Sequence, residues 1–252
     1  MAGHSHGANI RFRKDRVDAK KAKAFAKLAR MITVAAKGGG DPDGNARLRL
    51  AIDKARVLSM PKDVIERAIK KGTGSGAGGD FEEVLYEGYA PHGVALLLEI
   101  LTDNRHRTAA EVRLVFDRYG GNLGASGSVS WMFERKGVVR VPKAAGLDPD
   151  RLLEIASESG ADDLIDLDDA YELRCPPSAL EPVRSALAAG TVTIAESEQG
   201  WLPKTTVRID TFDEARKVLA CIDSLEENDD VQNVASNYDF ADDVLAALSA
   251  ET

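Results

Sequence analysis

The spacing of apolar and polar positions along the chain changes near residue 80. Before it, three segments carry apolar residues three and four positions apart, which is typical of amphipathic helices. These segments cover residues 18–36, 45–58 and about 61–71. Gly72, which directly follows two lysines, is a typical helix stop. The pattern therefore predicts a bundle of three short helices, followed by a glycine-rich linker over residues 72–79.

Beyond residue 80, runs with a β-type pattern alternate with helical ones. The runs 83–90 and 94–103 are joined by Pro-His-Gly, which is a hairpin signal. We then expect, in chain order, a helix over 107–120, a strand, turn and strand over 128–141 centred on Lys136-Gly137, a helix over 149–159, strands over 164–167 and 171–175, a helix over 178–188 and a strand over 192–198. With residues 137–141 as its first strand, the last piece has the β-α-β-β-α-β order of a ferredoxin-like domain.

The α/β piece before it lacks a closing helix and strand, which residues 212–225 and 231–235 can supply. The sequence thus predicts an α+β protein with an N-terminal three-helix basic domain and two ferredoxin-like α/β domains, the third inserted into the second. The expected boundaries are 1–79 for the first domain, 80–135 plus 204–240 for the second, 136–203 for the third, and 241–252 for an acidic tail. We expect this tail to form a short helix or to fray.

Charge is divided unevenly between these parts. The chain has a formal net charge of −8, but residues 1–79 hold 18 Lys and Arg against 7 Asp and Glu. The remaining residues hold 15 against 34. Such a division is typical of a protein in which the basic part binds nucleic acid and the acidic part does not.

The helix predicted over 18–36 has a cationic face. Phe25, Leu28 and Ile32 share its apolar stripe, and the opposite side lacks the acidic residues four positions away that a solvated face usually has. A face of one sign repels itself, so we expect a polyanion to cover it. The predicted nucleic-acid-binding residues are the cations of this helix, of the segment before it and of the next two helices: Arg11, Arg13, Lys14, Arg16, Lys20, Lys23, Lys27, Arg30, Arg47, Arg49, Lys54, Lys62, Lys70 and Lys71.

A second pair of cations lies in the acidic part, at the start of the helix predicted over 107–120. Asp103 and Asn104 suit a strand-to-helix turn and can cap that helix. Arg105 and Arg107 follow them. Two interpretations are open: Asp103 pairs internally with one arginine, or the two arginines are a second contact for a polyanion.

The sequence offers little for catalysis. The four histidines lack the spacing to a carboxylate that a zinc hydrolase needs, and the Gly-x-Ser-x-Gly elbow of a hydrolase is absent. We predict no catalytic residue, no metal, no cofactor and no small-molecule substrate. Cys175 and Cys221 are expected to be reduced core thiols, as in a cytoplasmic protein. No apolar run approaches the roughly 18 residues of a membrane span.

Several blocks of sequence carry a resemblance to a known family. They are MAGHS at 1–5, GGGDPDGNARLRLAIDKAR at 38–56, SMPKDVIERAIKKGTG at 59–74, LYEGYAPHGVALLLEILTDNRHRTAAEVR at 85–113 and GGNLGASGSVSWMF at 120–133. Together they resemble the YebC/PmpR family, which includes the mitochondrial translational activator of cytochrome oxidase. The match is dense over residues 1–135 and looser beyond.

The resemblance implies a cytoplasmic protein of three domains, with a basic helical first domain and two α/β domains. Bacterial members are generally described as DNA-binding transcriptional regulators, and a competing view treats the family as ribosome-associated translation factors. The chain departs from the family at His6-Gly7, where Lys-Trp usually follows MAGHS. This departure removes a cation and an aromatic ring that could stack on a base.

These observations together predict a non-enzymatic regulator of gene expression that binds nucleic acid through its N-terminal domain. A DNA-binding transcriptional regulator is the leading interpretation, and a translation factor that contacts ribosomal RNA is the alternative. Lysine and arginine do not distinguish the two, because both targets present phosphates. The first helix offers lysines and alanines rather than the Asn and Gln that read base edges, which favours RNA or a non-specific mode.

Overall fold

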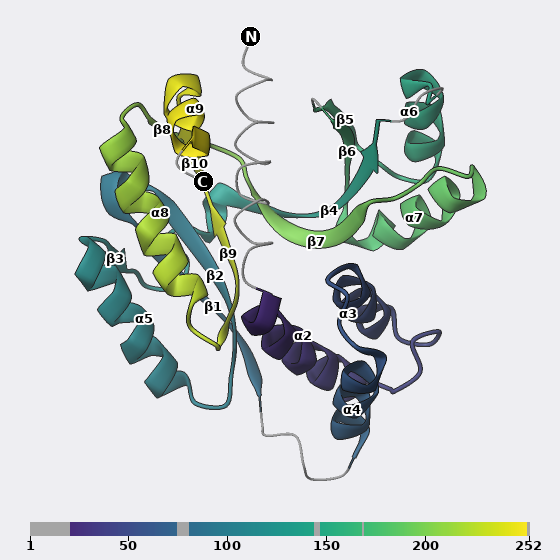
Figure 1. Ribbon diagram of the computed structural model, residues 1–252, viewed down its shortest axis with the longest axis horizontal. Helices are drawn as coiled ribbons and strands as arrows, with labels where there is room; N and C mark the ends of the chain where they lie inside the picture. Colours follow the sequence, from purple (N-terminus) through teal and green to yellow (C-terminus); the bar gives the residue numbers. More distant parts are fainter. Residues whose placement is uncertain (1–20, 75–80, 144–146, 168, 251–252) are drawn as a thin grey trace.

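The computed structural model describes residues 21–74, 81–143, 147–167 and 169–250. As expected, the fold is mixed α+β, with three helices followed by two parts that each contain a sheet. In Figure 1 the three N-terminal helices lie at the bottom. One sheet lies on the left with its helices, and the second sheet lies on the right with its own helices. We call these the helical bundle, the first α/β part and the second α/β part.

The helical bundle consists of α2 (Lys21–Ala36), α3 (Ala46–Val57) and α4 (Lys62–Thr73). Asn45 caps α3, because its side-chain oxygen accepts the backbone N–H of Leu48 at 3.1 Å. Ile32, Leu48 and Ile65 are buried in one common core, one from each helix. The predicted apolar stripes therefore form the bundle, since none of these short helices is stable without the others.

Gly72 is the second-last residue of α4, so this helix runs two residues past the predicted stop. It lies inside α4, where a Cβ atom would come within 2.2 Å of the Thr33 carbonyl oxygen and 2.7 Å of the Ala36 Cβ. The glycine therefore allows α4 to approach α2 closely. The linker predicted over 72–79 lies largely outside the described residues.

The first α/β part is built on an antiparallel sheet in the order β3-β1-β2-β9. Its strands are β1 (Glu82–Tyr89), β2 (Ala95–Thr102), β3 (Asn122–Leu123) and β9 (Val231–Ser236). The 3₁₀ turn η1 (Pro91–Gly93) joins β1 to β2, as the hairpin signal predicted. Helices α5 (Arg105–Tyr119) and α8 (Phe212–Glu226) share a core with this sheet through Phe116 and Val218, among others.

The connections of the first α/β part differ from the ferredoxin-like order that we expected. The hairpin joins β1 directly to β2, so no helix lies between the first two strands. Two short strands, β8 (Val207–Ile209) and β10 (Tyr238–Phe240), form a separate parallel pair. The expected tail forms α9 (Asp242–Ala250), whose Val244, Leu245 and Leu248 are buried in the same core. Three buried apolar side chains thus anchor α9 to this core.

The second α/β part has an antiparallel sheet in the order β5-β6-β4-β7. It comprises β4 (Phe133–Pro142), α6 (Pro149–Glu158), β5 (Asp163–Asp166), β6 (Ala170–Cys175), the turn η3 (Pro177–Ala179), α7 (Leu180–Ala189) and β7 (Glu196–Pro203). This chain order and this strand order are those of a ferredoxin-like domain. Its strands all come from residues 133–203, between the two stretches that form the first sheet. The exact domain boundaries stay a prediction.

Strand β4 corrects the turn that we predicted at Lys136-Gly137. It is continuous over ten residues and pairs with β7 from Phe133 to Arg140. Gly137 is buried in its middle, where a Cβ atom would lie 2.7 Å from the Cys175 sulfur and 3.0 Å from the Leu180 Cβ. The glycine makes room for these side chains. The long β4 also places its partner β7 later in the sequence than the predicted strand over 192–198.

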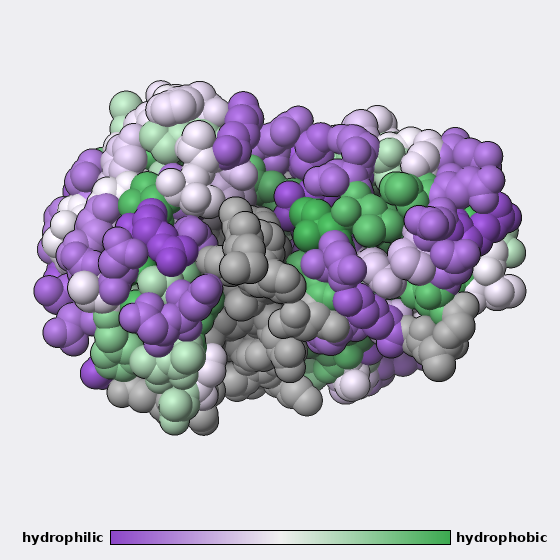
Figure 2. All heavy atoms as spheres, turned by 90° about the horizontal axis from the view of Figure 1, so that it is seen from above, coloured by the Kyte–Doolittle hydropathy of each residue, from purple (hydrophilic) through white to green (hydrophobic). Residues whose placement is uncertain are grey.

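Figure 2 shows hydrophilic side chains over much of both α/β parts on the face seen from above. Cys175 and Cys221 are both buried and unpaired with each other, as predicted. No helix among the described residues has both the length and the apolar character required to span a bilayer.

Candidate nucleic-acid interface

The predicted cations fall into three groups in the structure. Arg11, Arg13, Lys14, Arg16, Lys20 and the altered tip at His6-Gly7 lie outside the described residues, as does the side chain of Lys23. The second group, on α2 and α3, contacts the two α/β parts. The third group, on α4, faces solvent.

Helix α2 directs its two described cations at the first α/β part. The ammonium of Lys27 donates to the backbone oxygen of Glu226, the last residue of α8, at 2.6 Å. The guanidinium of Arg30 pairs with the Asp230 carboxylate at 2.7 Å and donates to the Asp229 backbone oxygen at 2.8 Å. The face that we expected to be open is therefore covered at these two positions by the turn between α8 and β9.

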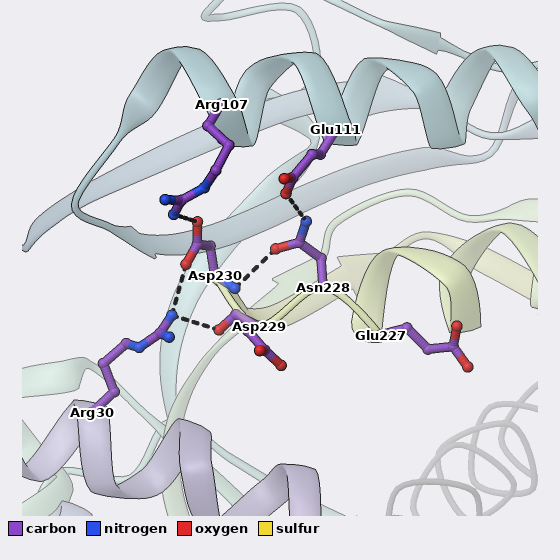
Figure 3. A pocket seen from close by; sticks show the side chains of 7 residues that line it. All are labelled: Arg30, Arg107, Glu111, Glu227, Asn228, Asp229 and Asp230. Atoms are coloured by element: carbon purple, nitrogen blue, oxygen red, sulfur yellow. Dashed lines mark hydrogen bonds and ion pairs between the residues drawn. The ribbon is translucent and has the colours of Figure 1, made fainter.

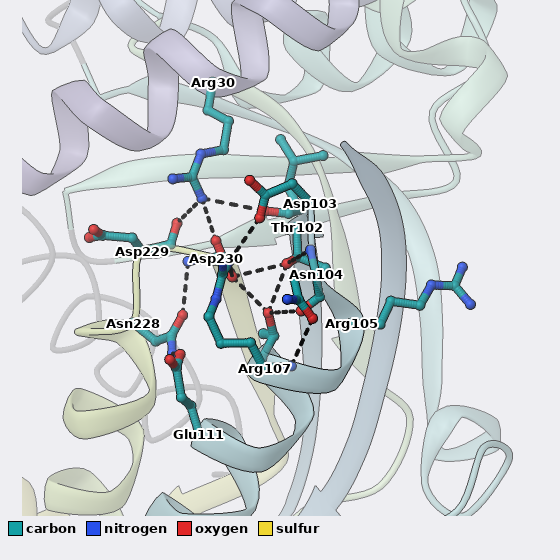
Figure 4. A network of polar contacts seen from close by, with 12 residues as sticks. Arg30, Thr102, Asp103, Asn104, Arg105, Arg107, Glu111, Asn228, Asp229 and Asp230 are labelled. Carbon is teal, nitrogen blue, oxygen red and sulfur yellow. Dashed lines mark hydrogen bonds and ion pairs between the residues drawn. The ribbon is translucent and has the colours of Figure 1, made fainter. Parts of the chain in front are cut away.

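Asp230 is the centre of this contact. Figure 3 shows Arg30 approaching it from α2 and Arg107 from α5 on the other side. One carboxylate oxygen accepts from Arg30, and the other accepts from Arg107 at 2.6 Å, Thr108 at 2.6 Å and Thr102 at 3.0 Å. Figure 4 shows the whole network. Only 5 % of Asp230 is exposed, so almost all of its partners are protein groups.

The network keeps Asp230 ionised. Burial by itself raises the pKa of a carboxyl group, because it disfavours the charged form. At Asp230 the hydrogen bonds outweigh burial, that from the Thr108 hydroxyl first, and its pKa is lowered. A buried carboxylate thus stays negative beside Arg30.

Helix α3 places its cations against acidic groups of both α/β parts. Arg47 pairs with Glu83 of β1. The other two pairs involve the second α/β part, with Arg49 at 3.5 Å from Glu181 of α7 and Lys54 at 2.5 Å from Glu198 of β7.

Lys54 is charged in this arrangement. Burial has the largest single effect and lowers the pKa of its ammonium, but the carboxylates of Glu198, Glu196 and Glu99 together outweigh burial, and the pKa is raised. The interface also has an apolar component, because Leu50 of α3 packs against the core of the second α/β part.

Helix α4 carries the exposed group. Lys70 and Lys71 lie in its last turn, and within the described part of the chain neither has an acidic partner. Lys62 lies in the first turn, 3.5 Å from the Glu66 carboxylate, with 90 % of its side chain exposed. Of the predicted cations that the structure describes, those on α4 are therefore the most accessible to a ligand.

The second candidate pair separates in space. Arg107 contacts Asp103 at 3.0 Å in addition to Asp230, so the internal pairing that we considered does occur. Arg105 points to the other side of the α5 start and pairs with Glu82 at 2.5 Å. As expected, Asn104 caps α5 by accepting the Arg107 backbone N–H at 3.0 Å.

Sequence reasoning missed Asp230 altogether. It lies in the acidic run Glu226 to Asp230, which looks like a solvated helix end. No local signal distinguishes it from Asp229, whose side chain takes no part in the contact with Arg30. Among the described residues, no three His, Cys, Asp or Glu side chains come together as metal ligands would.

Comparison with known proteins identifies two matching family models. Residues 5–75 match the TACO1/YebC protein N-terminal domain, and residues 81–238 match the TACO1/YebC second and third domain.

Relatives with known names span the whole chain. A protein of Acidithiobacillus ferrooxidans is 50% identical over 251 residues, and the match covers 99% of both chains. A protein of Maridesulfovibrio salexigens is 49% identical over 248 residues, and the match covers 98% of this chain and 99% of that one. Both are named "Probable transcriptional regulatory protein". The crystal structure of a conserved hypothetical protein from Aquifex aeolicus is similar with a TM-score of 0.79, at 47% identity, over 90% of this chain and 93% of that one.

Proposed function

The chain belongs to the TACO1/YebC family, and we propose that it is a cytoplasmic, non-enzymatic regulator of gene expression that binds nucleic acid through its helical bundle. We propose DNA as the target, since its relatives are named as transcriptional regulatory proteins. Ribosomal RNA is the alternative.

The proposal rests on one observation. Basic residues outnumber acidic ones in residues 1–79, and those on α4 are accessible. Lys70 and Lys71 form no ion pair with a described acidic residue, whereas cations on α2 and α3 do. Exposed lysines of this kind bind phosphates through charge and add no base specificity. The surplus of acidic residues in the rest of the chain repels the same ligand.

The test is the salt dependence of binding to duplex DNA by the full-length protein. Removing one cation that binds a phosphate should flatten the plot of log K against log salt by about 0.9. We expect this change for Lys70→Ala and for Lys71→Ala. Lys217→Ala is the matched control, because Lys217 is an exposed helical lysine on α8 of the acidic part.

Lys70 and Lys71 also lie where cations stabilise a helix end, by about 0.3–1 kcal/mol. Circular dichroism should therefore be used to confirm that the variants keep their helicity, so that a change in slope reports a lost phosphate contact and not a frayed helix. An unchanged slope in both α4 variants would contradict the proposed interface. Sedimentation of a cell lysate on a sucrose gradient separates the two targets, since only a ribosomal-RNA-binding factor should migrate with ribosomes.

A further inference from the structure

The cations of α2 contact acceptor oxygens of the acidic turn between α8 and β9. Arg30 binds a carboxylate oxygen at 2.7 Å and a carbonyl oxygen at 2.8 Å through the same nitrogen, and its guanidinium lies 5.2 Å from the ring centre of Phe81. Carboxylates and phosphates are both anions that Arg binds through charge-assisted hydrogen bonds. Asp230 thus occupies Arg30 as a phosphate oxygen would.

Lys27 is held by a different source of negative charge. Its acceptor, the Glu226 carbonyl oxygen, belongs to the last residue of α8. The C-terminus of a helix carries about half a negative charge on such carbonyl groups. Two neighbouring cations of α2 are therefore held by one segment of the first α/β part.

A third cation, on α3, is held by the second α/β part. Lys54 pairs with Glu198 of β7, where 36 % of the lysine side chain and 39 % of the glutamate side chain remain exposed. Such a pair is open to solvent ions, which weaken it. The bundle is thus held by Asp230 in the first α/β part and by Glu198 in the second, in both cases through predicted nucleic-acid-binding residues.

We infer that Asp230 and Glu198 form an autoinhibitory contact, in which the acidic parts of the chain compete with nucleic acid for Arg30, Lys27 and Lys54. This inference rests on the proposed function. In the closed arrangement the α4 cations are the most accessible of the predicted cations that the structure describes. A polyanion that displaces the acidic groups gains these three cations as well, and the bundle then moves away from both α/β parts.

The competition makes a prediction about affinity. When only a fraction of molecules is competent to bind fully, the apparent dissociation constant rises in inverse proportion to that fraction. Weakening the internal contact should therefore tighten binding. We expect roughly a 5-fold gain or more, which is the lower end of typical coupling between sites.

The experiment compares full-length variants that remove one internal acid and leave every cation in place. Asp230→Asn keeps the shape of the side chain and removes its charge. Glu198→Gln acts at a half-exposed pair, so it tests the same inference even if Asp230→Asn does not fold. Glu154→Gln is the matched control, because Glu154 pairs only with Arg151 on its own helix in the described structure. All three variants change the net charge equally.

A second measurement follows the opening directly. Val57 at the end of α3 and Leu114 on α5 are 66 % and 60 % exposed, so Val57→Cys with Leu114→Cys accepts a pair of fluorescent labels. The native thiols should not react, because burial raises the pKa of Cys175 to about 11 and that of Cys221 to about 12. We expect energy transfer between the labels to fall when duplex DNA is added.

The outcomes separate the two proposals. Tighter binding by Asp230→Asn or Glu198→Gln than by Glu154→Gln, together with a loss of energy transfer on adding DNA, supports the autoinhibitory contact. If the wild type binds and neither variant binds more tightly than the control, the contact is only structural and the inference is wrong, while the proposed function stands. If neither the wild type nor any variant binds DNA or ribosomal RNA, both proposals fail.

Discussion

Replacing the buried carboxylate of Glu87 should open the glycine-rich loop that follows β3. Glu87 lies on β1 with 4 % of its surface exposed. One of its oxygens accepts the backbone N–H of Gly127 at 2.7 Å, and the other accepts those of Val129 and Ser130 at 2.7 and 2.8 Å. One side chain thus satisfies three donors that no strand or helix pairs.

The cost of Glu87→Gln follows from these contacts. The amide oxygen can still accept from Val129 and Ser130, but the NH₂ group then faces the N–H of Gly127. A buried donor without an acceptor costs about 1–3 kcal/mol, and the loss of charge from the remaining bonds costs about 1 kcal/mol more. We therefore expect the variant to be less stable by about 2–4 kcal/mol. Glu82→Gln on the same strand breaks an exposed pair with Arg105 and should cost no more than about 1 kcal/mol.

Hydrogen exchange of residues 127–130 measures the free energy of opening this loop, and urea denaturation measures that of the whole molecule. The pH dependence gives an independent check. Burial raises the pKa of Glu87, but the three backbone hydrogen bonds outweigh it and the pKa is lowered. Its contribution is thus present above the unfolded value of about 4.3 and is lost as the pH falls through the folded pKa.

The difference in free energy of unfolding between the wild type and Glu87→Gln should therefore become smaller as the pH is lowered from about 7 to about 3.5. If Glu87→Gln costs no more than Glu82→Gln, or if its cost is the same at both pH values, the carboxylate does not hold the loop.

Two further predictions test the packing of glycine and cysteine. Gly72→Ala should lower the melting temperature, because overpacking against Thr33 costs about 1–3 kcal/mol. In an unhindered helix the same change would stabilise by up to about 1 kcal/mol, so a rise in the melting temperature would refute the close contact. Cys175 and Cys221 should resist a thiol reagent at about pH 8 in the native protein and react once it is unfolded, because burial raises their pKa values; rapid labelling of native protein would contradict their burial.

Many local elements of this protein follow from short-range patterns in its sequence. Apolar residues at helical spacing placed α2, α3 and α4, because a helix buries one stripe regardless of its partner. The Pro-His-Gly turn and the Asn104 cap are also local signals, and each has the predicted role. The order of elements in the second α/β part followed from the same kind of reasoning.

The tertiary structure decided what the glycines do. Gly72 and Gly137 look like a helix stop and a turn in the sequence, since glycine is common at both. In the structure each lies inside a regular element, where a neighbouring element comes too close for a Cβ atom. The neighbours, Thr33 and Cys175, are 39 and 38 positions away, so no local pattern contains this information.

The tertiary structure also decided which cations are accessible. Lys27 and Arg30 look like a free face because no acidic residue lies within one helical turn. Their partners, Glu226 and Asp230, are 199 and 200 positions further along the chain. Periodicity reports which side of a helix is apolar, but the charge that covers the other side is a property of the assembled fold. Only the fold brings the acidic turn between α8 and β9 against the basic helix.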